Sequence, residues 1–340
     1  MQRPHDRHSR RTERRRAPLD MGTAPATRDR GVPMSTLNAL IALIILPGGL
    51  AILLAGMVYE WVDRKLVARL QNRVGPRWYQ PLADTVKLLA KEEVLPAGVH
   101  AQMFYALPVI ALAGALTATL YVPVFGLSPA YSFNGDLIVT VYLLSLLTLC
   151  IGLAGANTLN RYALIGATRT LTQLFSYEAP FLLALLGPAL VAGSWQIGEI
   201  AHYAERHWLI LTQPVGFVVA IIGLMGKLEL PPFDAPEAET EIVAGALTEY
   251  SGRGLALFRL GKGVELVVGL TLVAAFYLGG VANPLLFFAK TLALLAGMAA
   301  LQTLLTRLRI DQTVGLWWRY GALLVLAQYL LVIVWEGVVA

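Results

Sequence analysis

The chain has 340 residues, of which 56% are hydrophobic and 14% charged, and its mean hydropathy is +0.61. This composition lies outside the usual range of soluble globular proteins and predicts an integral membrane protein. The formal net charge is +5, and the one cysteine, Cys150, lies in an apolar run. A disulfide framework or a cysteine-ligated cluster built by this chain alone is therefore excluded.

The positive charge is concentrated in residues 1–33. This segment holds nine arginines against four acidic residues, and the rest of the chain has 18 basic and 18 acidic residues. It has no apolar stretch, so we predict a disordered Arg-rich tail and neither a signal peptide nor a membrane span. A basic arm that binds anionic lipid is the alternative. We expect Met34 to be the true start of a single membrane domain, 34–340.

Apolar runs of about 20 residues recur from residue 37 onward, long enough for a hydrocarbon core of about 30 Å. They predict an all-α polytopic membrane protein with about eight transmembrane helices, at 37–59, 103–125, 137–158, 171–193, 211–227, 264–281, 284–304 and 315–338. The connections on one side hold 16 of the 18 Lys and Arg that follow Met34. They are 60–102, 159–170, 228–263 and 305–314 with the residues at their edges. The positive-inside rule places them in the cytoplasm, so we expect a multi-pass protein of a prokaryotic inner (plasma) membrane.

The first of these connections begins with acidic and basic residues at helical spacing. Asp63 and Arg64 follow Glu60 by three and four residues and so share one face of a helix; a solvated helix end is the alternative. The Gly75-Pro76 pair predicts a fixed turn. Apolar residues at helical spacing within 82–90 predict an amphipathic helix that lies at the membrane interface or packs on a partner.

Glu178 is the clearest anomaly within the apolar spans, because an ionisable residue in a membrane helix is a functional-site hypothesis by default. Arg169, nine residues earlier, is its expected partner at the cytoplasmic end. Lys262 and Glu265 stand at the start of the sixth predicted span, where they either pair or mark its boundary. His202 and His207 lack the spacing of metal ligands, and no metal site is predicted.

The third connection is strongly acidic. Six carboxylates fall within about 20 residues, on Glu229, Asp234, Glu237, Glu239, Glu241 and Glu249. If the chain is helical from Pro236 onward, Glu237 and Glu241 share one face, and like charges this close raise carboxyl pKa values toward neutrality. A solvated acidic loop is the alternative. Since no phosphate loop, dinucleotide fingerprint or nucleophile elbow occurs, we do not expect catalysis by this chain alone.

With these residues the sequence resembles the H subunit of NADH-quinone oxidoreductase, the subunit 1 family shared by respiratory complex I and membrane-bound energy-converting hydrogenases. The resemblance runs from about Leu37 to Ala340. Four segments carry it: Asp63-Arg64-Lys65 through Lys91-Glu92, Gly135-Asp136-Leu137, Ala163 through Ser176-Tyr177-Glu178, and Pro232-Phe233-Asp234 through Tyr250-Ser251-Gly252. Eight membrane helices with large cytoplasmic loops are also what this family has.

The resemblance implies a subunit that joins a peripheral redox arm to a membrane arm and passes the energy of electron transfer to proton or sodium movement. It implies a buried proton path through Glu178, Glu239, Glu241, Glu249 and Glu265. It also implies a redox-arm docking surface or quinone cavity at Asp63, Arg64, Arg73, Asp84, Arg169, Phe233 and Asp234. The expected partners are peripheral iron–sulfur and large subunits, antiporter-like membrane subunits and the lipid bilayer, with no nucleic acid.

No cofactor is expected on this chain. Quinone is a possible ligand at the interface, and iron–sulfur clusters with flavin or a nickel–iron centre belong to partner subunits. Two departures favour the hydrogenase branch (formate hydrogenlyase type): the first loop has one Gly-Pro turn where complex I sequences have several, and Lys262 stands where they tend to have an acid. Two further alternatives are a free-standing ion transporter that uses Glu178 and a purely structural anchor for a redox arm.

Overall fold

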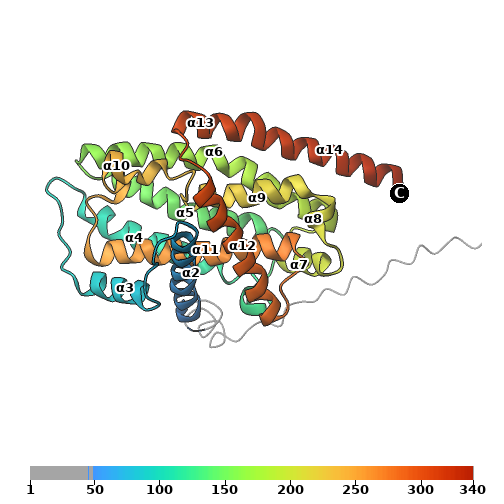
Figure 1. The fold of residues 1–340 in the computed structure, drawn as a ribbon, viewed down its shortest axis with the longest axis horizontal. Coiled ribbons are helices and arrows are strands. Elements are labelled where there is room, and N and C mark those ends of the chain that lie inside the picture. Colours follow the sequence, from blue (N-terminus) through green and yellow to red (C-terminus); the bar gives the residue numbers. More distant parts are fainter. Residues whose placement is uncertain (1–44, 46–48, 340) are drawn as a thin grey trace, which may run out of the picture. The chain divides into compact units, whose positions relative to one another are not determined.

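The structure is a computed structural model that describes residue 45 and residues 49–339. The predicted tail, 1–33, the expected start at Met34 and most of the first half of the span 37–59 lie outside the described residues. Within the described part the chain is helical and has no strand (Figure 1). The fold is that of an all-α polytopic membrane protein, as predicted.

Helix labels follow Figure 1. The long helices are α2 (Gly49–Leu70), α4 (Ala101–Ala118), α5 (Asp136–Ala156), α6 (Arg161–Ala192), α9 (Pro214–Lys227), α11 (Gly252–Tyr277), α12 (Pro284–Leu304) and α14 (Ala322–Val339). The shorter ones are α3 (Gln80–Ala90), α7 (Ile197–Arg206), α8 (Leu209–Thr212), α10 (Glu239–Ile242) and α13 (Ile310–Leu316). Single turns are η1 (Val124–Gly126), η2 (Ala235–Glu237) and η3 (Gly245–Leu247), and the π-helical turn η4 (Trp317–Gly321) joins α13 to α14.

Six of the described helices are long and apolar enough to cross a membrane: α4, α5, α6, α11, α12 and the continuous run from α13 into α14. Each overlaps a predicted span. The fifth predicted span corresponds to α9, which is apolar but has only 14 residues. The described part of the first predicted span lies in α2, which continues to Leu70.

The predicted connections 159–170 and 228–263 are wrong in their extent. Helix α6 already begins at Arg161 and α11 at Gly252, so large parts of both connections are helical. With 32 residues, α6 is about 48 Å long and exceeds the hydrocarbon thickness of about 30 Å. The prediction ended each helix at the first charged residues. The helices α6 and α11 instead extend past the hydrocarbon core into the region where charged residues are tolerated.

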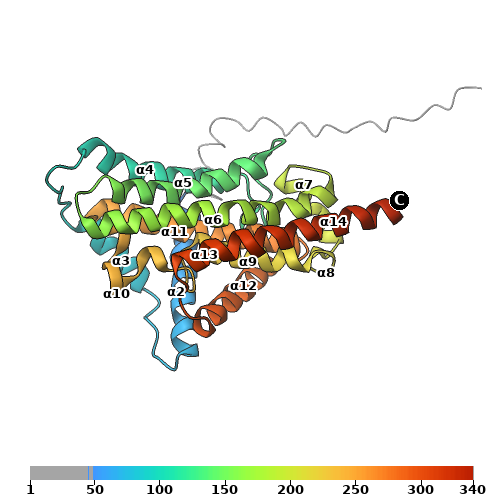
Figure 2. The ribbon, with the colours of Figure 1, turned by 90° about the horizontal axis from the view of Figure 1, so that it is seen from above.

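Helix α11 is the centre of the bundle. Every residue from Gly263 to Tyr277 is buried, and α11 contacts α2, α4, α9 and α12 among other helices. Its crossing with α2 is close because two glycines meet: a Cβ atom built on Gly56 would lie 2.8 Å from the backbone carbon of Gly263. Helix α14 lies along the upper edge of the bundle in Figure 1 and passes in front of the other helices in Figure 2, which is seen from above.

A proline in helix α6 leaves one backbone carbonyl without its intrahelical hydrogen bond, and a side chain of another helix supplies the donor. Pro188 has no N–H, so the carbonyl of Ala184, four residues earlier, loses its intrahelical partner. The hydroxyl of Tyr277 in α11 donates to this carbonyl at 2.5 Å. The two helices are thus joined at a point where the backbone would otherwise leave a polar group unpaired in an apolar core.

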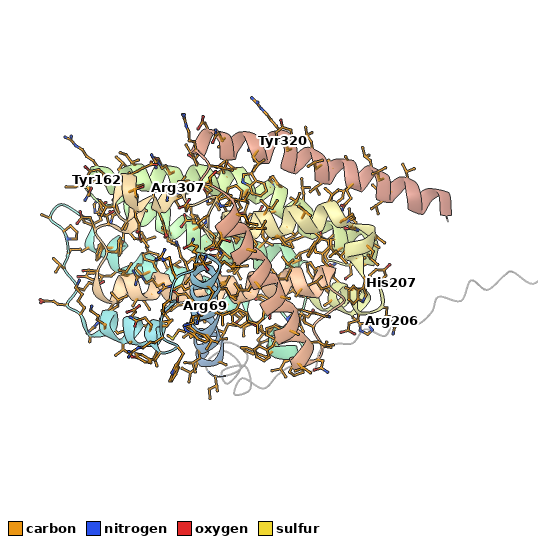
Figure 3. The ribbon with its side chains drawn as sticks, in the orientation of Figure 1. Arg69, Tyr162, Arg206, His207, Arg307 and Tyr320 are labelled. Atoms are coloured by element: carbon orange, nitrogen blue, oxygen red, sulfur yellow. The ribbon has the colours of Figure 1, made fainter. Side chains whose placement is uncertain are left out.

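The amphipathic helix predicted within 82–90 is present as α3. Its apolar residues Leu82, Val86 and Leu89 are exposed on the surface of the chain. Tyr162 and Arg307 lie toward one end of the bundle, Arg206 and His207 at the other, and Arg69 of the first predicted connection between them (Figure 3).

Candidate functional site

A cavity of about 460 Å³ opens between α2, α11 and the acidic connection that follows α9. Three of the predicted site residues line it, namely Asp63, Arg64 and Glu239. The other charged side chains of its wall are Glu60, Glu229, Glu237, Arg259 and Lys262, and five leucines supply most of the apolar wall. The cavity is therefore an amphipathic chamber with charges of both signs.

Asp63 lies beyond the end of the predicted first span, on the last turns of α2. Its carboxylate accepts a hydrogen bond from Gln302 of α12 at 3.1 Å. Burial raises the pKa of Asp63 to about 6, although the hydrogen bond from Gln302 and the charge of Arg64 lower it. At neutral pH this carboxyl is close enough to its pKa to exchange protons with the cavity.

The first connection folds back on α2. Trp61 donates to the carbonyl of Pro76 at 3.2 Å, and Lys65 to that of Gly75 at 3.5 Å. The predicted turn at Gly75-Pro76 is not seen: residues 73–77 are irregular, and these two bonds hold them against α2. The segment packs closely on α2 here, because a Cβ on Gly75 would lie 2.7 Å from the Lys65 side chain and 3.0 Å from the Cα of Lys65.

Two predicted residues of this connection lie outside the cavity. Arg64 pairs with Glu60 and lies 4.0 Å from Asp84, which itself accepts a hydrogen bond from Gln80 at 2.9 Å. Arg73 is exposed and bonds to Gln71. Arg73 and Asp84 therefore belong to the surface beside the cavity.

In the inner wall of the cavity, one lysine joins two carboxylates. Lys262 of α11 lies 2.7 Å from Glu229 and also pairs with Glu237. Glu229 is buried, and desolvation raises its pKa above the ordinary value even though the charge of Lys262 lowers it. Glu237 is about half exposed, at 48%.

A second charged cluster lies deeper, where α5, α6, α9 and α11 meet. Lys227 is completely buried; its ammonium donates to Ser145 at 2.8 Å and lies 3.6 Å from Glu265 and 4.0 Å from Glu178. Ser145 in turn donates to Glu178 at 2.5 Å. Glu265 follows Lys262 by three residues on α11, so one helical turn separates this cluster from the cavity wall.

The prediction that Arg169 is the partner of Glu178 is wrong. Arg169 lies 2.7 Å from Glu241 and donates to the carbonyl of Ala235. Nine residues along one helix correspond to about 13 Å of rise and two and a half turns, so the two side chains leave α6 on opposite sides. The cation beside Glu178 is Lys227 from another helix.

Asp234, Glu241 and Arg169 form a surface network through a residue of a further connection. Arg307 pairs in a bidentate manner with Asp234 and lies 3.9 Å from Glu241. The network joins α6, the acidic connection and the segment before α13. Fork-shaped Arg–carboxylate pairs of this kind fix geometry as well as charge.

The backbone beneath this network is anchored by a buried glutamine. Gln173 of α6 donates to the carbonyls of Gly226 and Phe233, at 2.9 and 2.8 Å. Phe233 itself is buried, with its ring centroid 5.5 Å from that of Trp317. Phe233 therefore holds the connection in the core and does not line the cavity.

The acidic connection is not one helix from Pro236 onward, which corrects that expectation. It consists of η2, α10 and η3, interrupted by Val243 with φ +62°. Glu237 and Glu241 consequently do not share a face and pair with different cations, Lys262 and Arg169. Glu249 lies apart from both and accepts a hydrogen bond from Asn160 at 2.5 Å.

The comparisons with known proteins place this geometry in a family. The sequence profile described as NADH dehydrogenase matches residues 41–333. The chain belongs to the NADH dehydrogenase family. Among curated relatives, the H subunit of the NADH-quinone oxidoreductase of Carboxydothermus hydrogenoformans is 33% identical over 305 residues, covering 85% of this chain and 87% of the relative. The corresponding H subunit of Geobacter sulfurreducens, the second of that name, is 36% identical over 280 residues, covering 76% and 85%.

A solved structure shares the fold. It is described as the membrane-bound sulfane sulfur reductase, an archaeal respiratory membrane complex, and one of its chains superimposes with a TM-score of 0.77. The match covers 87% of this chain and 98% of that chain at 24% identity. The bundle described above is thus an arrangement found in a respiratory membrane complex.

Two cations of this NADH dehydrogenase family member, Lys227 and Arg307, were not predicted as part of the site. Glu229, Glu237 and Lys262 were noted in the sequence, but no place in the site was assigned to them. The sequence carried one signal for Lys227: a buried carboxylate such as Glu178 requires a cation, and Lys227 ends the apolar run nearest to the acidic connection. Nothing in the spacing connected Arg307 to Asp234, 73 residues away.

Proposed function

We propose that this chain is the membrane subunit of a complex I-like energy-converting oxidoreductase. It joins a peripheral redox arm to the membrane arm and couples electron transfer to the movement of protons or sodium ions. The membership of the NADH dehydrogenase family and the names of the relatives support this role. Iron–sulfur and large subunits of the peripheral arm and antiporter-like membrane subunits are the proposed partners, in the inner membrane of a prokaryote.

The observation that carries the proposal is the sequence of ionisable groups from the cavity into the membrane. It begins with Asp63 and the Glu229–Lys262 pair in the cavity wall and continues one helical turn away to Glu265. From there Lys227 and Ser145 lead to Glu178. Charged groups are expensive at membrane depth and are a strong indication of an ion or proton pathway.

The test uses the complete complex in sealed vesicles. Glu178→Gln and Glu265→Gln keep shape and hydrogen bonding but cannot exchange protons. We expect ion movement to fall on the order of tenfold or more, since a proton-transfer group typically contributes at least that much, while the peripheral arm still transfers electrons to a soluble acceptor. Glu199→Gln, on α7 at the opposite end of the bundle, is the matched control. Unchanged ion movement in both variants, with normal assembly, would establish a structural anchor instead.

Two versions of this function differ in the electron acceptor: one complex reduces quinone, and the other does not use quinone. A volume of about 460 Å³ is in the range of small-molecule sites, and the leucines of the wall suit a quinone, the substrate that the names of the relatives contain. Eight of the 17 lining residues are charged, however, and Lys262 is bound on both sides by carboxylates. This charge favours, as the second candidate, a quinone-independent complex of the membrane-bound hydrogenase type.

Purification of the assembled complex separates the two candidates. A nickel-binding large subunit together with hydrogen evolution would identify the hydrogenase type, whereas quinone reduction without nickel would identify the quinone reductase. A chain that is isolated alone and moves ions as a single polypeptide would overturn both and identify an ion transporter.

A further inference from the structure

Lys262 holds one ammonium group between two carboxylates in very different surroundings. Glu229 has 2% of its side chain exposed, Glu237 has 48%, and Lys262 itself has 23%. The two acids also differ in backbone context, because Glu229 follows α9 whereas Glu237 ends the single turn η2. A buried carboxylate depends on its counter-charge far more than an exposed one does.

Glu229 is held in an uncommon state. Its backbone φ is +53°, a left-handed conformation that non-glycine residues seldom adopt. One of its oxygens, Oε1, is buried and makes no hydrogen bond within the described residues. Lys262 and Thr170 face the carboxyl, and the ammonium of Lys262 is the neighbouring positive charge that favours its ionised form.

The segment that carries Glu237 is built to move more easily than the helices around it. Between Ala235 and Leu247 it contains three short helical pieces of three to four residues each. Val243, at φ +62°, is a β-branched residue in a strained conformation and is exposed. Ion pairs of Glu237 and Glu241 attach this segment to α11 and α6.

Lys262 also has an alternative partner within reach. Glu265 lies three residues further along α11, a spacing at which side chains of one helix meet. Its carboxylate already lies 3.6 Å from Lys227, so a second ammonium would complete a pair of cations around it. In this exchange the Lys262 side chain would turn from Glu229 toward Glu265, one helical turn further along α11.

We propose that Lys262 is a positioning residue that sets the charge of Glu229 according to the position of the Glu237 segment, and so controls proton entry from the cavity. When Glu237 is in place, Lys262 is held on Glu229, which stays ionised. When the segment moves away, Lys262 turns toward Glu265 and Glu229 takes up one proton from water in the cavity. The proton is released when the pair forms again.

The surrounding charges decide how strong this effect is. Those that face Glu229 or line the same cavity come from four elements: Glu60, Asp63 and Arg64 of α2, Lys227 of α9, Glu237 and Glu239 of the acidic connection, and Arg259, Lys262 and Glu265 of α11. Arg64 is engaged by Glu60, and Lys227 by the deeper cluster. Lys262 is therefore the cation whose loss leaves Glu229 without a direct counter-charge.

The decisive measurement is the infrared absorption of protonated carboxyl groups in the complete purified complex at pH 7. Lys262→Met should show a carboxyl band that the wild type lacks, and the double variant Lys262→Met with Glu229→Gln should lose it. Lys262→Arg, which keeps the charge, and Lys87→Met, on the exposed face of α3, should resemble the wild type. Absence of the band in Lys262→Met, or its persistence in the double variant, would overturn the proposal.

A second readout tests the link to Glu237. In Glu237→Gln we expect the carboxyl band of protonated Glu229 to appear at pH 7, because Lys262 is no longer held on Glu229, and we expect fewer ions to be moved per electron transferred. Unchanged ion yield in Glu237→Gln would contradict this link. The inference rests on the proposed function, but the two fail separately: the infrared band reports the Lys262–Glu229 pair even if Glu178→Gln shows that the chain moves no ions.

Discussion

Lys227 is the residue on which the deeper cluster depends. Its side chain is completely buried and compensates two carboxylates, Glu178 and Glu265. A buried ion pair is costly to break from one side, because the remaining charge is left without compensation. The same lysine lies 5.6 Å from the ring centroid of Tyr177, a further contact that a neutral side chain would not reproduce.

Lys227→Met should therefore destabilise the assembled chain by about 3–5 kcal/mol. Combining it with Glu178→Gln and Glu265→Gln should recover a large part of this loss, since the triple variant leaves no buried charge. Graded heating of the complex, followed by native gel electrophoresis, measures both. A triple variant as unstable as the single one would show that packing and not charge is responsible, and Lys87→Met controls for the loss of a lysine.

Asp63 gives a pH dependence whose sign is fixed by its raised pKa. In the folded chain this pKa is about 6, higher than in the unfolded chain, so the folded state binds the proton more strongly. The cost of an ionised Asp63 is present above pH 6 and disappears as the pH falls toward the ordinary carboxyl pKa of about 4.

We expect Asp63→Asn to be more stable than the wild type above pH 6 and to approach it in stability toward pH 4. Thermal melting of the two complexes at matched pH values measures the difference. A difference that is constant across this range would mean that Asp63 does not titrate there.

At this scale the sequence predicted the acids better than their cations. Glu178 could be recognised because it interrupts an apolar run. Its partner could not, because Lys227 comes from another helix and looked like the end of a span. Arg169 was the nearest cation along the chain, but the helical repeat turns it away from Glu178.

At the scale of helices, the crossing of α2 with α11 places Gly56 against Gly263. A Cβ atom on Gly56 would lie 2.8 Å from a backbone atom, which cannot move aside as a flexible side chain can. This crossing also forms one side of the cavity, since Glu60 and Asp63 follow on α2 and Lys262 precedes Gly263 on α11.

Gly56→Leu should separate the two helices and strongly reduce the yield of assembled complex. Gly297→Leu is the matched control, because a Cβ at Gly297 of α12 has no neighbour within 4 Å among the described residues. Yield on native gels at equal expression measures the effect. Equal yields for the two variants would show that α2 is free to shift at this crossing.

The types and order of the long helices followed from apolar runs, but their ends did not. Charges signal where a helix leaves the lipid and give no information on whether the helix continues, as α6 and α11 do. The division of the acidic connection into η2, α10 and η3 depends on ion pairs with Lys262, Arg169 and Arg307. Local spacing cannot anticipate contacts from such distant positions.

For the whole molecule, Tyr162 and Arg307 lie toward one end of the bundle and Arg206 and His207 at the other (Figure 3), and the positive-inside rule assigns the end with Arg307 to the cytoplasm. This orientation places the cavity and the surface network on the cytoplasmic side, which the proposed docking of a redox arm requires. It is testable because Cys150 is the chain's one cysteine, so Cys150→Ser provides a cysteine-free background.

In that background, Arg77→Cys should react with a membrane-impermeant thiol reagent in inside-out vesicles and His207→Cys in right-side-out vesicles. Accessibility follows from the orientation, since both positions lie in exposed connections. Labelling is quantified by mass shift on a gel. The reverse pattern would invert the topology and place the cavity outside the cell.

The burial of α11 has a consequence for biogenesis. This helix carries Lys262 and Glu265, and it is enclosed by helices that precede it in the chain and by α12, which follows. Entering lipid as a lone segment would expose both charges to hydrocarbon at a high cost. We therefore expect α11 to leave the translocon only after α2, α4, α5 and α9 have been inserted. These helices then provide polar contacts for its charged residues.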